Sequence, residues 1–314
     1  MASTAKRPWY MFYPLAGMLL LSLVWCGYWF IAFSGAKELI QAKRLEFASQ
    51  GVELACARES WGGFPFRFEF QCEIAALQLT QNNDTYKIQS TKILAVAQAY
   101  NPLHVILLVD GPTSIDQTAV IHERALISVT VNLAQEWDAS LDAPHVNAQG
   151  LFAAAQLNVF ARKINGRLDL AANAQELTVI RPENPPVILS SAELVGQTSA
   201  SFLTGRRLAG QSLDISALKI SQGAVDFAAT GTVSLDAQHR LAGKLSSQTN
   251  DLKGVMKFIE PIFALNEQDS ATIRNLVTLT GSDPATNTTK ADFVAKDGAL
   301  YWGLIKLADL TPLY

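Results

Sequence analysis

Residues 67–80 read RFEFQCEIAALQLT, and this stretch decides the fold class. Apolar and polar side chains alternate through its first half, where the apolar positions are Phe68, Phe70, Cys72 and Ile74. A period of two indicates a β-strand with one buried side and one solvent-facing side. The phase slips at Ala75 and Ala76 before the alternation resumes, which predicts a β-bulge or a bend at that point.

Similar strand-like runs recur on the C-terminal side of this strand. They cover residues 86–97, 104–109, 127–133, 151–160, 167–171, 176–180, 213–220 and 231–235. Asn165-Gly166 and Asp297-Gly298 each favour a two-residue hairpin turn, because these residue types tolerate the left-handed backbone that such turns require. The second turn lies at the centre of a closing hairpin over 291–306. Most of these strands keep one polar face, which is typical of antiparallel sheets.

Two stretches near the C-terminus break the strand pattern. Apolar residues recur at helical spacing from Leu252 to Ile259, and Pro261 kinks or ends that helix. A second helical stretch follows a capping residue at Asp269 and stops near Gly281. We therefore expect two short helices near the C-terminus.

On the N-terminal side, residues 11–33 form an uncharged run of 23 residues, MFYPLAGMLLLSLVWCGYWFIAF. A helix of this length spans about 34 Å, enough to cross a hydrocarbon core of roughly 30 Å. The run predicts a transmembrane anchor at 11–33, preceded by a cytoplasmic tail at 1–10. A cleaved signal peptide stays open as the alternative, because Lys6 and Arg7 precede the run.

The remaining chain falls into two expected parts. A juxtamembrane helix is expected over 34–50, from a Ser34 cap to a stop at Gly51. Residues 51–314 are interpreted as one exported β-rich domain. Positive charges flank both ends of the apolar run and leave its orientation undecided, whereas the short N-terminal tail favours export of the large C-terminal part.

Cys56 and Cys72 are 16 residues apart in this exported part, whereas Cys26 lies inside the apolar run. The spacing of the pair suits a disulfide across a hairpin in an oxidising compartment. Two buried free thiols remain the alternative. Without a nearby His, the two cysteines make a poor zinc site.

Between these cysteines, residues 61–68 read WGGFPFRF. The two glycines allow a sharp change of chain direction, and the proline holds its own φ and biases its predecessor to extended geometry. We interpret as a rigid structural corner the residues Gly62, Gly63, Phe64, Pro65, Phe66 and Arg67. Three aromatic side chains are expected to enter the core from it: Phe64, Phe66 and Phe68. The alternative is a partner or lipid contact through exposed Trp61 and Phe64.

The WGGFPFRF motif, placed about 27 residues beyond the apolar run, resembles a bacterial family of membrane-anchored envelope proteins known as domain of unknown function 2125. Residues 293–313 (FVAKDGALYWGLIKLADLTPL) look like that family's closing pattern of strand, Asp-Gly turn, strand and final Pro. The organisation is more distantly similar to AsmA-like envelope proteins, in which an N-terminal anchor carries a long curved sheet that encloses an apolar groove.

This resemblance implies a single-pass protein of the bacterial inner membrane with its C-terminal domain in the periplasm. The expected fold class is mainly β with minor α. An N-terminal transmembrane helix is followed by an extended, curved antiparallel β-sheet domain, with the two short helices near its C-terminus.

Composition and motifs narrow the function classes. The chain has 25 Lys and Arg against 28 Asp and Glu, so its net charge near −3 gives no reason to expect nucleic acid as a partner. Its four histidines are scattered without a metal-binding spacing, and GxSxG, GxxxxGK[ST] and GxGxxG are all absent from the sequence. We therefore expect no cofactor, no metal site, no catalytic residue and no enzymatic activity.

The leading hypothesis is a membrane-anchored envelope protein that binds or guides lipid on an apolar sheet face. The alternative is a structural or assembly factor that acts through protein contacts. A third possibility is an envelope hydrolase whose catalytic groups come from distant strands.

Overall fold

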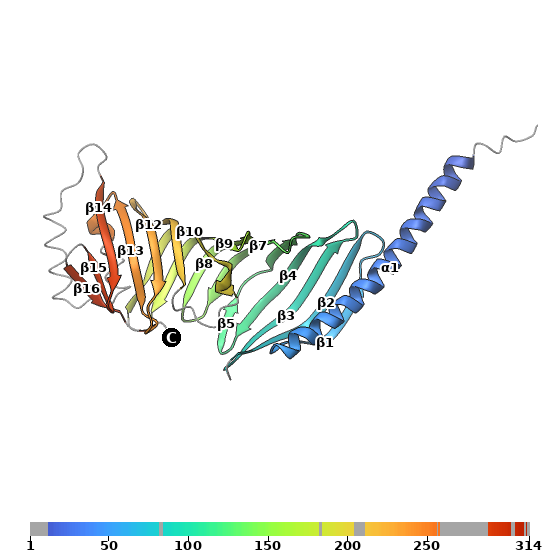
Figure 1. Cartoon of the computed structure of the whole chain (residues 1–314), viewed down its shortest axis with the longest axis horizontal. Coiled ribbons are helices and arrows are strands. Elements are labelled where there is room, and N and C mark those ends of the chain that lie inside the picture. The colour runs from blue at the N-terminus through green and yellow to red at the C-terminus, as the bar shows by residue number, and fades with distance from the viewer. Residues whose placement is uncertain are drawn as a thin grey trace, which may run out of the picture.

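The computed structural model of the chain describes residues 12–81, 84–181, 184–203, 211–255, 257, 288–302, 305–310 and 312. These residues form one long N-terminal helix and one large antiparallel sheet (Figure 1). The sheet extends away from the helix as a long, curved ribbon of strands, and the first half of the helix projects beyond it. The predicted fold class is confirmed.

Helix α1 (Tyr13–Ser49) has 37 residues, which corresponds to about 55 Å. It runs without a break through the expected anchor and the expected juxtamembrane helix, so Ser34 lies inside the helix and the predicted cap there is wrong. Residues 30–40 contain one glycine and no proline, which is why the helix continues. The helix ends at Ser49, directly before the predicted stop at Gly51, which has a φ of 82°.

The sheet has sixteen strands, each hydrogen-bonded to antiparallel neighbours. They are β1 (Val52–Gly62), β2 (Arg67–Gln81), β3 (Asp84–Gln98), β4 (Asn101–Ile115), β5 (Thr118–Ile121), β6 (Ala125–Val131), β7 (Trp137–Ala148), β8 (Phe152–Ile164), β9 (Arg167–Arg181), β10 (Asn184–Ser199), β11 (Ser212–Gln222), β12 (Val225–Leu235), β13 (Leu241–Thr249), β14 (Thr289–Lys296), β15 (Ala299–Trp302) and β16 (Ile305–Asp309). A short 3-10 helix, η2 (Ala200–Leu203), follows β10. Strand neighbours follow chain order, except that β5 and β6 share the space between β4 and β7.

A line of backbone bends crosses the strands from β2 to β10. Ile74, His145 and Glu176 lie in the middle of β2, β7 and β9, yet their φ angles are 51°, 50° and 50°. Pairing continues on both sides of each of these residues. In β4 the line passes through Gly111-Pro112, a cis peptide at which the register with β3 shifts. We call this feature the bend line.

The sheet folds along the bend line, because side chains from its two sides pack together. One cluster joins Ala125 and Ala143 on one side to Val146 on the other. Partly buried residues from both sides pack against it, namely Val109, Val120, Leu141, Phe152 and Leu157. A single sheet thereby buries apolar side chains without a second sheet packed against it.

Two further clusters fill the C-terminal end. A helical segment at 252–255 begins after Asp251, whose carboxylate accepts a hydrogen bond from Gly254 N–H at 3.0 Å. Its Val255 packs against β10 and β12, and its Leu252 packs against β14 and β15. This segment covers the sheet at that end.

The predicted hairpins at Asn165-Gly166 and Asp297-Gly298 are confirmed, since all four residues have positive φ and join β8 to β9 and β14 to β15. The predicted runs 167–171 and 176–180 belong to one strand, β9, which bends at Glu176. The first predicted C-terminal helix is described only at 252–255 and 257, and the second, from Asp269 to Gly281, lies outside the described residues.

Candidate functional site

One face of the sheet is apolar from β1 to β15, and we call it the inner face. Residues paired across an antiparallel ladder point to the same side, so the register assigns each strand position to a face. Phe70 pairs with Ala95, which belongs to the same row as Leu107 and Ile127 in the following strands. That row continues through Leu141, Val159, Ala172, Leu194, Leu218 and Ala229.

Burial identifies this face as the concave one. From β2 to β14, the buried hydrophobic residues of the described strands all fall on it, among them Cys72, Ala75, Leu168 and Val187. The opposite face holds charged and amide residues together with well-exposed apolar ones such as Phe160 and Ile188. A sheet with one solvated face shows this asymmetry.

The bend line is what keeps the inner face apolar along the full length of the strands. Cys72 and Ala75 are 0% and 2% exposed, whereas Ile74 between them is 68% exposed. The alternation therefore changes phase at Ile74 and returns Leu77 and Leu79 to the side of Cys72. The same change occurs between Ala143 and Val146 and between Ala174 and Leu177. The predicted bend in β2 is confirmed, but its pivot is Ile74, which does not share a face with Phe68 as expected.

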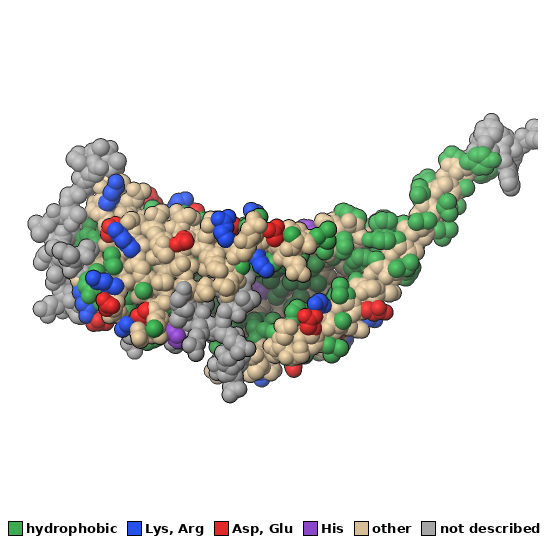
Figure 2. Space-filling view, viewed as in Figure 1, with side chains coloured by type: hydrophobic (Ala, Val, Ile, Leu, Met, Phe, Trp, Pro, Cys, Tyr) green, Lys and Arg blue, Asp and Glu red, His purple; other side chains and the backbone are tan. Residues whose placement is uncertain are grey.

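The inner face differs between the two ends of the sheet. Side chains of β2 to β6 such as Leu77, Ile93 and Leu107 are only half-buried. Figure 2 shows hydrophobic side chains gathered in a hollow of the molecular surface beside α1. At the other end, Phe227 and Val255 are 9% and 0% exposed. The inner face of β2 to β6 is an accessible apolar surface, which we call the open region. The C-terminal end is a packed core, which we call the closed end.

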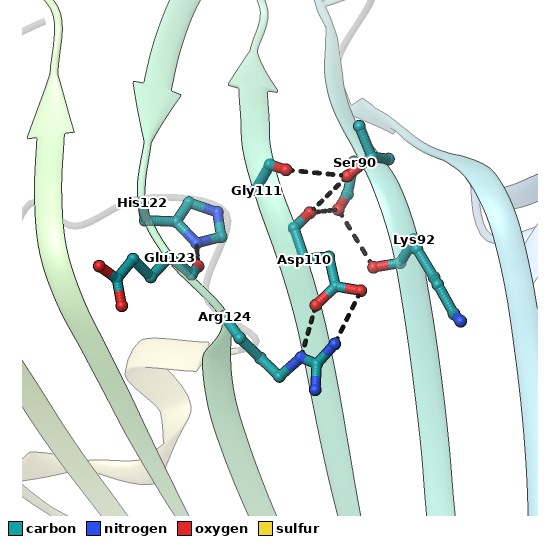
Figure 3. A network of polar contacts seen from close by, with 8 residues as sticks. Ser90, Lys92, Asp110, Gly111, His122, Glu123 and Arg124 are labelled. Atoms are coloured by element: carbon teal, nitrogen blue, oxygen red, sulfur yellow. Dashed lines mark hydrogen bonds and ion pairs between the residues drawn. The ribbon is translucent and has the colours of Figure 1, made fainter.

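A polar network fixes the bend line at β3, β4 and the segment between β5 and β6 (Figure 3). Arg124 donates two hydrogen bonds to the Asp110 carboxylate, at 2.6 and 3.3 Å. The hydroxyls of Ser90 and Thr91 donate to the Asp110 carbonyl at 2.9 and 2.8 Å. The hydrogen bond from Arg124 holds the pKa of Asp110 below its usual range, and the same contact raises the pKa of Arg124.

Helix α1 packs on the first edge of the sheet through aromatic rings. Trp29 contacts Phe64 and Phe68, with ring centroids 5.2 and 5.8 Å apart. Phe33 contacts Trp61 at 6.2 Å, and Trp61 in turn lies 4.7 Å from Phe70. Farther along α1, Arg44 forms an ion pair with Glu59 at 2.7 Å. The inner face is therefore bounded at β1 by the second half of the helix.

The residues of the predicted corner, 62–67, join β1 to β2 beside the middle of α1. Gly63 is required there, because its φ is 104° and an added Cβ would overlap the Arg67 carbonyl oxygen. Gly62 lies at the end of β1 without such a restriction. The Phe64-Pro65 peptide is cis. Arg67 begins β2 and pairs with Glu69 at 2.5 Å.

The expectation that Phe64, Phe66 and Phe68 all enter the core is wrong for two of them. Phe64 and Phe66 are 52% and 64% exposed. They follow the chain around the outside of the turn and contact rings of α1, whereas Phe68 lies within β2 on the inner face. Trp61 is half-buried against Phe33 and Phe70, so Phe64 offers more free surface than Trp61.

Cys56 and Cys72 lie on the inner face of β1 and β2, with their sulfur atoms 2.00 Å apart and their Cα atoms 5.4 Å apart. A disulfide at this place ties the first two strands together across their ladder. Cys26 lies on α1 as a free thiol.

The partners of three histidines are ordinary polar groups. His104 contacts Ser128 at 2.9 Å, and His122 contacts Thr113 at 2.8 Å and the Glu123 carbonyl oxygen. His145 contacts the Glu123 carboxylate at 3.2 Å. Within the described residues, no three His, Cys, Asp or Glu side chains are grouped so as to hold a metal ion.

A depression of about 450 Å³ lies between β7 and β11 and includes Asp138, Arg162 and Asp169. Its described lining contains no histidine. Sequence reasoning did not single out these residues, because they are ordinary polar positions of alternating strands.

Fold and site together define a class of protein in which an N-terminal apolar helix carries a single antiparallel sheet folded around an apolar inner face. The chain belongs to the bacterial family described as "Uncharacterized protein conserved in bacteria (DUF2125)", whose model matches residues 29–311. The match spans the second half of α1 and all sixteen strands of the sheet, including the WGGFPFRF motif. No curated protein and no solved structure matches the chain.

Proposed function

We propose that this protein is a non-enzymatic component of the bacterial envelope that binds or guides lipid on its inner face. In this proposal α1 anchors the chain in the inner membrane with a single pass, and the sheet lies in the periplasm. The observation that carries the proposal is the accessible apolar surface of β2 to β6 beside an apolar helix long enough to span a bilayer.

The dimensions and energetics of the inner face suit acyl chains. Sixteen strands spaced about 4.8 Å apart give a sheet roughly 70 Å long, so an extended acyl chain of about 20 Å lies across about four strands. Each methylene removed from water contributes about 0.8 kcal/mol, so partial coverage of one chain already supplies several kcal/mol. The accessible part, β2 to β6, is wide enough for one such chain.

Two features support the proposed compartment. A Cys56–Cys72 disulfide persists in an oxidising space such as the periplasm, not in a reducing cytosol. The helix Tyr13–Ser49 is long and apolar enough to cross a membrane, and the whole sheet follows it along the chain, so in this proposal all of the sheet lies on the periplasmic side. A signal sequence satisfies the same length and composition criteria as an anchor, so retention of α1 in the mature protein is itself part of the proposal.

The alternative, a structural or assembly factor, is favoured by the exposed ring of Phe64 beside α1. In that case crosslinking at Phe64 recovers one defined protein partner, and a polar substitution there abolishes recovery while the protein still folds.

The lipid proposal is tested by lipid extraction and mass spectrometry of the full chain purified in mild detergent. Leu107 and Leu108 are adjacent, half-buried residues of β4 on opposite faces, so Leu107→Asp and Leu108→Asp form a matched pair. We expect retained lipid in the wild type and in Leu108→Asp, and about tenfold less in Leu107→Asp, because a carboxylate on the inner face must be desolvated under an acyl chain. Equal lipid content in the two variants would contradict the proposal.

A further inference from the structure

We propose that the corner (62–67) and the β3–β4 turn (99–101) are embedded in the bilayer surface beside α1, so that the sheet begins inside the membrane interface. The partner of this surface is lipid, at the level of the headgroups and upper acyl chains. The inference rests on the proposed anchoring by α1, and it names where the sheet meets the membrane.

The length of the membrane span sets the depth of the corner. A hydrocarbon core needs about 20 helical residues, so a span that starts at Tyr13, the first residue of α1, ends at Ala32. The contacts between α1 and the corner run from Trp25 to Phe30, within the last eight residues of that span. The corner therefore lies toward the membrane interface at the end of the span.

Hydrogen bonds from α1 side chains satisfy main-chain carbonyls of the two turns. Trp25 Nε1–H donates to the Pro65 carbonyl at 2.9 Å, and Trp29 Nε1–H donates to the Arg67 carbonyl at 3.1 Å. The Tyr28 hydroxyl donates to the Ala99 carbonyl at 2.8 Å. Three polar side-chain groups of an apolar helix thus all donate hydrogen bonds to carbonyls of the two turns.

Main-chain bonds complete this pattern. Arg67 N–H donates to the Gly63 carbonyl at 3.0 Å, and Ala99 N–H donates to the Phe66 carbonyl at 2.9 Å. Irregular backbone is tolerated at membrane depth only where its polar groups are satisfied within the protein. Carbonyls in water need no such partners, so these bonds point to a site where water is scarce.

The two turns also present aromatic side chains to their surroundings. Residues 61–66 and 99–103 contain no charged side chain, and the one charged residue of the corner, Arg67, is paired with Glu69. Phe64, Phe66 and Tyr100 are 52%, 64% and 68% exposed. The amphipathic rings of Tyr and Trp are enriched at the boundary between membrane and water, which applies to Tyr100 and to the indole and phenol groups of the neighbouring α1 turns, whereas the apolar rings of Phe64 and Phe66 suit the upper acyl chains.

The consequence concerns access to the inner face. Phe68 follows the corner directly and already lies on the inner face. An acyl chain entering beside the corner passes from the bilayer onto the sheet without crossing bulk water. Embedding thereby joins the membrane to the proposed lipid-binding surface.

The test uses depth-dependent quenching in the full chain, reconstituted in phosphatidylcholine vesicles that contain nitroxide-labelled lipids. A Cys26→Ser background removes the free thiol, and a polarity-sensitive fluorophore is attached to a new cysteine in separate variants. Phe66→Cys and Tyr100→Cys probe the two turns independently, in case one of them fails to fold. Phe160→Cys probes a similarly exposed aromatic position far along the sheet, and Leu20→Cys probes α1 itself.

We expect blue-shifted emission and strong quenching at Phe66, Tyr100 and Leu20, with shallow nitroxides most effective at the two turns. Phe160 is expected to remain unquenched. Quenching at Leu20 combined with solvent-like emission at both turns would overturn the inference while leaving the anchor intact. Solvent-like emission at Leu20 as well would overturn the anchoring proposal and this inference together.

Discussion

Apolar and polar residues alternate at both ends of the sheet, but the inner-face side chains are buried in a core at one end and accessible at the other. At the C-terminal end, Phe227 of the sheet packs in a buried cluster with Val255 of the helical segment 252–255. Near the helix, Leu77 and Leu107 occupy equivalent inner-face positions and remain half-buried. An apolar strand face therefore does not by itself distinguish a core from a binding surface. What distinguishes them is the presence of a covering element.

The largest expected effect is on the closed end. Phe227→Ala removes a side chain that is 9% exposed, and we expect it to lower the free energy of unfolding by about 3 kcal/mol. Denaturant unfolding of the full chain in detergent measures this loss. Lipid content per folded molecule should stay at the wild-type value. Loss of lipid in this variant would show that the closed end takes part in binding.

A smaller stability effect is expected at the open region. Leu107→Ala should lower the free energy of unfolding by about 1 kcal/mol, because this side chain is only half-buried. Retained lipid should fall even though the fold persists. A loss as large as that of Phe227→Ala would indicate that Leu107 is part of a sealed core, and the contrast between the two ends would disappear.

The bend line offers a comparison of two isoleucines. Ile74 has a φ of 51° and Ile188 lies in regular β10, although the two are 68% and 59% exposed. A left-handed β-branched residue costs about 1–2 kcal/mol, which Gly avoids. We expect Ile74→Gly to raise the free energy of unfolding by about 0.5 kcal/mol and Ile188→Gly to lower it by about 1 kcal/mol. Equal losses would argue against strain at the bend.

The smallest expected effect is the loss of the Asp110–Arg124 contribution to stability at low pH. Because Arg124 lowers the pKa of Asp110 in the folded protein, this carboxylate stabilises the fold above its unfolded pKa. The contribution is lost as pH falls through the lower, folded pKa. We expect Asp110→Asn to lower Tm at pH 7 by about 2 °C or less, with the difference shrinking as pH falls below about 4. Thermal unfolding from pH 7 to pH 3 checks this, and a difference that grows with acidification would have the wrong sign.

Local patterns were enough to predict the class of the fold. The strand at 67–80, the hairpin at Asn165-Gly166 and the closing hairpin at Asp297-Gly298 depend on side-chain alternation and on turn chemistry, and all three can be read along the chain. Strands β1, β5, β7, β10 and β13 are not among the runs that the sequence predicts. Pro144 interrupts β7, Pro185 and Pro186 open β10, and small or polar residues weaken the pattern in β13.

The site could be predicted only in outline. The sequence predicts one phase slip, at Ala75 and Ala76, but not its recurrence across neighbouring strands. The signal was present as two adjacent polar residues between apolar ones, in Gln175-Glu176 and Ser190-Ser191. Their alignment into one bend line depends on strand register, which no single strand reveals. The aromatic contacts between α1 and the corner are equally remote in sequence.

The central claim is that lipid occupies the inner face at the open region. The most direct measurement places a photo-crosslinking amino acid at Leu107 or at Leu108 in cells, followed by purification and mass spectrometry of the adducts. The account predicts lipid adducts at Leu107, on the inner face, and few at Leu108, on the outer face of the same strand. Protein adducts or no adducts at Leu107, or lipid adducts of equal yield at both positions, would contradict it.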